Sequence, residues 1–307
     1  MKKLAASLLV LSICAGCGSG TPAEDNEPNQ DAQTSETSAP SDTADGTAAT
    51  TEAPVSLVQL WSLGGFSDPE GVAEGPDGNY FISNVAGTGD AADGTGWISV
   101  ISPFGEMIEP QFATGLNAPK GMVVDRGVLY VADINQIRMV DAREGTILRT
   151  LDVEGAEFLN DMVSWNATVL ASDSGTGRIY RLAGDEADVW LEDERLAGAN
   201  GLTADADRLL IATMDSGSLY EVTAAKDLKE IASGMKNADG IGVIDGGYLV
   251  SSWPGQVWFV SDAGETSKVL DTQADGIFQN DLTILNDTVI IPNWRPGTVT
   301  AWKVEVE

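Results

Sequence analysis

Six polar residues recur along the chain in a pattern that points to chemistry carried by oxygen atoms. Each is followed directly by Gly or Asp and then by an apolar run, and the successive spacings are 50, 40, 40, 39 and 41 residues. The six anchor residues are Glu70, Lys120, Asn160, Asn200, Asp239 and Asn280. Carboxylate and amide oxygens are ligands that calcium accepts, usually about six to eight with water included. If the anchors meet at one place, they predict a site for a divalent cation, most simply Ca²⁺.

A ring that contains two carboxylates requires a positive charge, because buried carboxylates repel each other and lose hydration. A bound cation is one source of that charge, an ion pair with Lys120 is a second, and a water-filled channel is the remaining alternative. In a ring of six repeats, Lys120 faces Asp239 across the centre and Glu70 faces Asn200. Lysine is long enough to lean over the mouth of the channel, so the cation is the favoured interpretation.

The composition excludes several other classes of site. The 307 residues include no His, and the two Cys residues, Cys14 and Cys17, both precede the first repeat. Catalysis by Ser-His-Asp or Cys-His groups and His-ligated zinc, copper or haem are therefore excluded, as are disulfides and thiolate sites in the body of the chain. The net charge of −30 repels phosphate backbones, so we expect no binding of nucleic acid.

The elements that position the anchor residues follow from the same repeats. An apolar strand ends at a second polar residue 14 positions after the first anchor and 13 positions after each of the other five. These second residues are Asn84, Asp133, Asp173, Thr213, Ser252 and Asn293. Further apolar runs follow in each repeat, and four strands in about 40 residues is typical of a β-propeller blade. Residues 55–307 therefore predict an all-β, six-bladed propeller with four antiparallel strands per blade.

The two ends of this region predict how the ring closes. Only 28 residues remain from Asn280 to Glu307, which leaves room for three strands. The segment 55–61 precedes the first blade and is apolar enough to supply the fourth strand. Pairing of this N-terminal strand with the last blade would remove an open sheet edge. The alternative is an open solenoid of six units.

Over residues 55–307 these motifs resemble the gluconolactonase–regucalcin (senescence-marker-protein-like) family of six-bladed propellers. The resemblance lies in Pro69-Glu70-Gly71, Asn160-Asp161, Asn200-Gly201-Leu202 and Asp239-Gly240. It implies that Glu70, Asn200 and Asp239 hold a divalent cation and that Asn160 lies beside the metal and the substrate. Sugar-lactone members of the family carry an Arg two residues before the third-blade Asn, where this chain has Phe158. That difference points away from a polar sugar acid as the substrate.

Other residues are predicted to form the substrate pocket around these ligands. They are Lys120, Phe158, Asn280, Trp253 and Trp294, with Asn84, Asp133 and Asp173 in the loops of the same face. Packing between blades is the alternative for the two tryptophans. The first blade also carries an insertion, 87–96, which is interpreted as a hairpin tip, as a lid, or as a second cation loop through Asp90 and Asp93. Asp161 and Asp281 either support the metal ligands or cap turns.

The first 54 residues are predicted to be a leader and a tether. A basic start and a ten-residue apolar run precede Cys14-Ala15-Gly16-Cys17, which resembles a bacterial lipobox. Residues 1–17 are therefore interpreted as a lipoprotein signal peptide with Cys17 as the lipidated residue, and a plain cleaved signal is the alternative. Residues 18–54 contain eight acidic and no basic residues and predict a disordered linker. These features predict a location in the cell envelope, at the periplasmic or extracellular face of a membrane, with the lipid as the expected attachment.

Two functions are consistent with these observations. The first is a metal-dependent hydrolase of a lactone or ester, in which Asp239 acts as base or nucleophile or orients water. The second is a non-catalytic propeller at the cell surface or in the periplasm that binds a ligand or another protein, since propellers serve many unrelated functions. In either case we expect a small-molecule ligand and a monomer.

Overall fold

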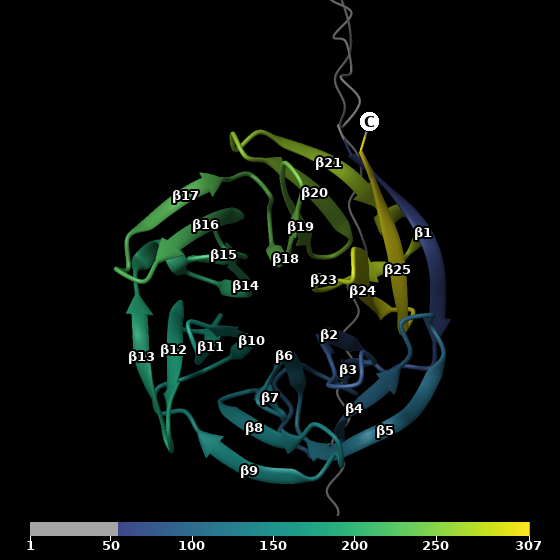
Figure 1. The fold of residues 1–307 in the computed structure, drawn as a ribbon, viewed down its shortest axis with the longest axis vertical. Helices are drawn as coiled ribbons and strands as arrows, with labels where there is room; N and C mark the ends of the chain where they lie inside the picture. The colour runs from purple at the N-terminus through teal and green to yellow at the C-terminus, as the bar shows by residue number, and fades with distance from the viewer. Residues whose placement is uncertain (1–54, 307) are drawn as a thin grey trace, which may run out of the picture. The chain divides into compact units, whose positions relative to one another are not determined.

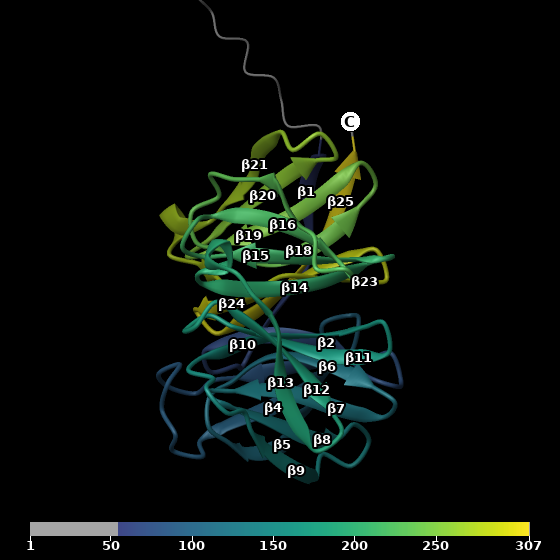
Figure 2. The ribbon, with the colours of Figure 1, turned by 90° about the vertical axis from the view of Figure 1, so that its left-hand side faces the viewer.

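The computed structural model of this chain describes residues 55–306. The predictions for residues 1–17 and 18–54, including lipidation of Cys17, lie outside the described residues. Within them, six antiparallel sheets follow one another around a central axis, and Figure 1 shows the innermost strand of each sheet facing the centre. Figure 2 shows the same ring from its side. The predicted all-β, six-bladed propeller is confirmed.

Each of the first five blades is built from four consecutive strands. Blade 1 contains β2 (Pro69–Glu74), β3 (Tyr80–Asn84), β4 (Gly96–Ile101) and β5 (Met107–Leu116). Blade 2 contains β6 (Pro119–Asp125), β7 (Val128–Asp133), β8 (Gln136–Asp141) and β9 (Ile147–Asp152). Blade 3 contains β10 (Leu159–Trp165), β11 (Thr168–Asp173), β12 (Arg178–Ala183) and β13 (Glu186–Glu192). Blade 4 contains β14 (Ala199–Asp205), β15 (Arg208–Thr213), β16 (Ser218–Thr223) and β17 (Leu228–Ala232). Blade 5 contains β18 (Ala238–Ile244), β19 (Gly247–Ser252), β20 (Gln256–Ser261) and β21 (Thr266–Asp271).

The last blade closes the ring with both ends of the described chain. Its outermost strand is β1 (Val55–Gly64), which pairs with β25 (Thr298–Val306). The next strand inward is β24 (Thr288–Arg295), which pairs with β25. Closure by the N-terminal strand therefore agrees with the prediction. The inner strand of this blade is split into two short pieces, β22 (Phe278–Gln279) and β23 (Thr283–Leu285), which both pair with β24. Asn280 lies in the interruption between them.

The hydrophobic core is divided into six clusters, each lying between two neighbouring blades. One cluster joins Val163 and Leu170 of blade 3 to Leu202 and Leu209 of blade 4, and the other five follow the same plan. Each sheet is apolar on both faces because it contacts a neighbour on each side, and this contact holds the ring together. Besides the strands, the described residues form two short 3₁₀ helices, η1 (Glu194–Leu196) and η2 (Gln273–Asp275). No helix in the 55–306 range has the length and apolar character needed to cross a membrane.

The anchor residues occupy a local irregularity that recurs in the inner strands. In blades 1 to 5 the pairing register between the first and second strands shifts across the anchor and the residue after it, for example between Ala199 and Leu202. Such a bulge bends the strand and turns the side chain away from the regular alternation. The polar residue followed by Gly or Asp is therefore the sequence of a bulge that directs one side chain toward the channel.

Glycine follows the anchor where two inner strands approach each other most closely. A Cβ added to Gly201 would overlap the carbonyl oxygen of Asp239 in the next blade and lie 3.0 Å from the Cα of Gly240. Gly71 has the same relation to blade 2, where an added Cβ would lie 2.7 Å from the carbonyl oxygen of Lys120. The contact between backbones excludes any side chain there.

Candidate functional site

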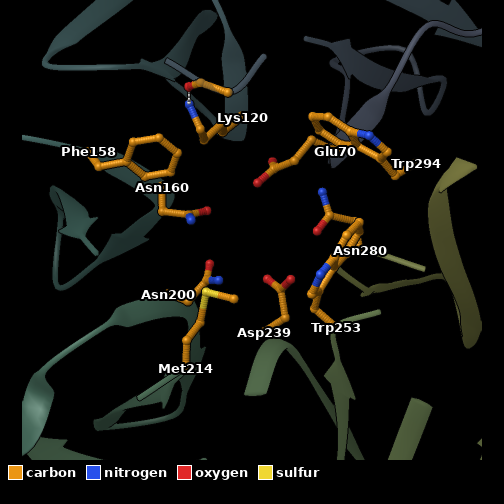
Figure 3. Close-up of a pocket in the computed structure, with 11 residues that line it drawn as sticks. Glu70, Lys120, Phe158, Asn160, Asn200, Met214, Asp239, Trp253, Asn280 and Trp294 are labelled. Carbon is orange, nitrogen blue, oxygen red and sulfur yellow. Dashed lines mark hydrogen bonds between the residues drawn. The ribbon is translucent and has the colours of Figure 1, made fainter. Parts of the chain in front are cut away.

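One pocket at the mouth of the channel collects the six anchor residues and the three predicted aromatic residues. Its volume is about 300 Å³, which is at the small end of ligand sites. The lining includes the six anchor residues together with Phe158, Trp253 and Trp294. Figure 3 shows the carboxylates of Glu70 and Asp239 and the amides of Asn160, Asn200 and Asn280 directed toward one central space. The ring that the repeat spacing predicted is thus present as a spatial cluster.

The two carboxylates of the ring are buried. Glu70 is 5% exposed and Asp239 is 3% exposed. Burial, followed by repulsion from Asp239, raises the pKa of Glu70 well above its ordinary value. Burial and the charge of Asp161 raise the pKa of Asp239 to about 7. Among residues 55–306, neither carboxylate forms an ion pair with a lysine or arginine. The charge of Lys120 lowers the pKa of Glu70, but by less than burial and Asp239 raise it.

Lys120 does not neutralise the carboxylates through a direct contact. Its ammonium donates hydrogen bonds to the carbonyl oxygens of Gly89, at 2.8 Å, and Ala118, at 3.0 Å. The same nitrogen lies 4.2 Å from the centre of the Phe158 ring, where the face of the aromatic ring attracts the charge. Burial lowers the pKa of Lys120. The interpretation of the ring as an ion pair with Lys120 is therefore not supported by the geometry.

The amides of the ring have free oxygen atoms. The Oδ1 of Asn200 is buried and has no hydrogen-bond partner within the described part of the chain. Asn160 donates from its Nδ2 to Ser174 at 3.2 Å, and that bond directs its Oδ1 into the pocket (Figure 3). A buried acceptor without a partner carries a desolvation cost, which a cation at the centre of the ring would remove.

The oxygen atoms of the ring are suitable ligands for a hard cation. They combine two anionic carboxylates with neutral amides, as calcium sites do. No cluster of three or more His, Cys, Asp or Glu side chains suited to a metal occurs among residues 55–306. A cation held here would therefore depend on the amides of Asn160 and Asn200, and on water, as well as on Glu70 and Asp239.

Two further carboxylates, Asp161 and Asp281, follow anchor residues and are partly buried. Asp161 accepts hydrogen bonds from its neighbour Met162 and from the backbone of Leu202 in the next blade, each at 2.7 Å. Asp281 accepts from the backbone of Leu282 at 2.7 Å. Burial raises the pKa of Asp161 to about 7 and that of Asp281 well above its ordinary value. Neither residue lines the pocket. Asp161 binds the inner strand of blade 4 two residues after Asn200, so it supports the strand that carries one of the predicted ligands.

The polar residues at the ends of the second strands have a different role from the predicted one. Asp133 accepts hydrogen bonds from the backbone of Asn117 and Ala118, and Asp173 accepts from Glu157 and Phe158. Asn84 accepts in the same way from Ser67. All three side chains are fully buried and do not line the pocket. They are not mouth residues, because they hold the loop that leads into the inner strand of their own blade.

Several residues that shape the site were missed by the sequence reading. Met214 follows the second strand of blade 4 and lines the pocket, as does Gly89 of the first-blade insertion. The carbonyl oxygen of Gly89 accepts a hydrogen bond from Lys120, so the insertion reaches the wall of the pocket. In the strands behind the ring, Ser83, Ser172 and Ser251 accept hydrogen bonds from the backbone N–H that follows the anchor, at 2.7 to 2.9 Å. These serines could have been found from the sequence, because each stands one position before the second polar residue of its repeat.

We expect the protein without bound metal to lose stability as the pH rises. The pKa of Asp161 and of Asp239 is about 7 in the folded chain against an ordinary value of 3.8, so between these limits the folded state binds more protons than the unfolded state. The free energy of unfolding therefore falls with rising pH, by roughly 3–4 kcal/mol per carboxylate. Thermal unfolding in chelator should show a Tm that is lower near pH 8 than near pH 5.

Added Ca²⁺ should raise the Tm more near pH 8 than near pH 5, because it binds the deprotonated carboxylates. Monovalent salt is the control, since it screens surface repulsion and leaves buried groups largely unaffected. A Tm in chelator that is independent of pH, in the presence of salt, would show that the buried carboxylates are not destabilising.

Comparison with known proteins supports the fold. No family model and no curated protein matches the chain. Among solved structures, a gluconolactonase from Xanthomonas campestris is 16% identical with a TM-score of 0.60, and the match covers 81% of this chain and 89% of that one. A streptogramin B lyase is 14% identical with a TM-score of 0.57, covering 82% and 98%. A catalytically inactive variant of virginiamycin B lyase from Staphylococcus aureus is 13% identical with a TM-score of 0.56, covering 81% and 99%. The chain is therefore a six-bladed β-propeller whose structural neighbours include a gluconolactonase and streptogramin-type lyases.

Proposed function

We propose that this protein is a hydrolase of a lactone or ester and that it depends on a divalent cation, with Ca²⁺ as the expected metal. The observation that carries the proposal is the pair of buried carboxylates, Glu70 and Asp239, which face one pocket together with unpaired amide oxygen and without a cationic partner. Glu70, Asn160, Asn200 and Asp239 would hold the cation. When bound, such a cation supplies Lewis acidity toward a carbonyl oxygen.

Residues of the chain carry out proton transfer and orient the substrate. Asp239 accepts a proton from a water molecule as the water oxygen attacks the carbonyl carbon of the ester. The bond between that carbon and the alkoxy oxygen then breaks, and the proton passes to the departing oxygen. The products are an acid and an alcohol, or one hydroxy acid from a lactone. The amide of Asn280, on the opposite side of the ring from Asn160, lies where it can orient the substrate (Figure 3).

Histidine-dependent chemistry is not an alternative for this chain. In the virginiamycin B lyase structure the inactive variant has a histidine replaced by alanine. The present sequence contains no His, so any acid–base step must be carried by a carboxylate or by water. The gluconolactonase among the structural neighbours is consistent with hydrolysis of a cyclic ester.

Removal of the metal provides the direct test. We expect chelator to reduce hydrolysis of lactones and aryl esters by at least about 10²-fold, because the carbonyl then loses its main electrostatic stabilisation. Addition of Ca²⁺ should restore the rate, and hydrolysis is followed by pH-stat titration of the acid released. Full activity after chelation would exclude metal-assisted hydrolysis, whereas Ca²⁺-dependent stability without turnover on any substrate would favour the non-catalytic binding propeller.

A further inference from the structure

The side chains in the wall of the pocket restrict the class of substrate that fits, in addition to the polar ring. We propose that the pocket selects uncharged lactones or esters with an aromatic or other apolar substituent, and that it disfavours sugar-derived and anionic ligands. The proposal rests on the proposed hydrolase function and specifies its substrate class.

Four apolar side chains surround the polar ring. They are Phe158, Met214, Trp253 and Trp294, and all four line the pocket (Figure 3). Each is only partly buried, and none belongs to the six inter-blade cores of residues 55–306. The alternative that the two tryptophans pack between blades is therefore not supported. Partly exposed large apolar groups that gather in a cavity are typical of a site for apolar ligand surface.

The aromatic rings are held in place by one another. Trp253 meets Trp294 edge to face, with ring centres 6.2 Å apart and an angle of 87° between the rings. On its other side Trp253 meets Phe278 in a similar arrangement at 6.1 Å. These contacts are favourable for aromatic pairs and restrict the rings of the wall, so a ligand does not have to order them on binding.

The pocket has no free cation for an anionic ligand. Lys120 is the only basic residue in the lining, and it is 3% exposed. Its ammonium is committed to the carbonyl oxygens of Gly89 and Ala118 and to the face of Phe158. The floor carries two carboxylates, whose charges one divalent cation balances without surplus. A ligand carboxylate or phosphate would therefore find no excess positive charge in the floor and no available counter-charge in the wall.

The wall of the pocket offers few of the donors and acceptors that a polyol requires. The carboxylates and amides lie in the ring, where they face the centre, while the wall is mainly aromatic and thioether surface with the indole N–H groups of Trp253 and Trp294 and the committed ammonium of Lys120 as its side-chain donors. Hydroxyl groups placed against that surface would lose hydrogen bonds to water without replacement, which is unfavourable. A carbonyl at the ring and an apolar group against Trp253, Trp294 and Phe158 satisfy both parts of the pocket.

Binding and turnover can be measured with matched probes in the Ca²⁺-loaded chain. The binding probe is 6-phenylpiperidin-2-one, a lactam that is not hydrolysed as an ester is, and unsubstituted piperidin-2-one is its control. Calorimetry should show at least about 10-fold tighter binding of the phenyl compound, since the ring buries apolar area. For turnover, kcat/KM for δ-phenyl-δ-valerolactone should exceed that for glucono-δ-lactone, which has the same ring size, by about 10²-fold or more.

Two substitutions locate the selectivity in the wall. Phe158→Arg places a cation in the wall and should reduce the preference for the phenyl compound by about 10-fold. Phe104→Arg is the matched control, because Phe104 is 82% exposed and lies outside the pocket; it should leave the preference unchanged. Trp294→Ala is the second variant of the wall and should lower affinity for the phenyl lactam even if Phe158→Arg fails to fold.

The outcomes separate the substrate class from the hydrolase function. Tighter binding of the phenyl lactam without hydrolysis of any lactone would support the ligand class and overturn the proposed reaction. Hydrolysis without preference for the phenyl substituent, or faster turnover of glucono-δ-lactone, would leave the reaction intact and overturn the substrate class. Equal binding of the two lactams to the wild-type chain would also overturn it.

Discussion

Asp239→Asn is expected to reduce hydrolysis of a lactone or aryl ester by about 10²- to 10³-fold, the scale associated with loss of one critical electrostatic group in an active site. The substitution keeps the shape of the side chain but removes a metal-ligand charge and the proposed base. It should also stabilise the protein in chelator near pH 8, because a buried carboxylate without a cationic partner becomes a neutral amide. Ca²⁺ should then raise its Tm less than that of the wild-type chain.

Asp207→Asn is the matched control, since Asp207 is exposed and does not line the pocket. It should leave turnover and the response to Ca²⁺ unchanged. Steady-state kinetics and thermal unfolding of both variants at two pH values make the comparison. Wild-type hydrolysis by Asp239→Asn would remove Asp239 from the mechanism, and a loss of stability in chelator would show that its charge is compensated in the folded chain.

Gly201→Ala is expected to destabilise the fold strongly. An added Cβ would overlap the carbonyl oxygen of Asp239 and approach the Cα of Gly240, and backbone atoms of two paired sheets have little freedom to move away. Overpacking of this kind costs about 3 kcal/mol, which corresponds to a fall in Tm of roughly 6–12 °C for a domain of this size. Activity should fall as well, because the strand that is displaced carries Asp239.

Gly64→Ala provides the control for this prediction. Gly64 ends β1, and the atom nearest to an added Cβ is Cγ2 of Thr298 at 3.9 Å, an ordinary contact distance. Thermal unfolding should place this variant close to the wild-type chain. A Tm for Gly201→Ala within about 1 °C of that of the control would show that the inner strands can separate without significant cost, contrary to the close packing expected of protein interiors.

The sequence alone determined the architecture and most, but not all, of the residues that line the pocket. A repeat of about 40 residues in which every strand alternates with a turn signal is sufficient to predict blades, and the shortened last repeat was sufficient to predict closure by residues that precede the first blade. The anchors were recognisable because a bulge needs a distinctive pair of residues at a constant position in each repeat. Phe158, Trp253 and Trp294 could be added because they lie within a few residues of that position or its partner on the second strand.

Only the tertiary structure decided where the side chains point and with what they pair. Lys120 lines the pocket at an anchor position, yet its ammonium binds backbone carbonyl groups and not the carboxylates. Asp133 and Asp173 end their second strands as predicted, yet they bind backbone N–H groups of their own blades and do not reach the pocket. Met214 and Gly89 reach the pocket without any signal in the repeat. Side-chain direction depends on bulges and on contacts between blades that are distant in sequence, and the residue type at a repeated position does not specify those contacts.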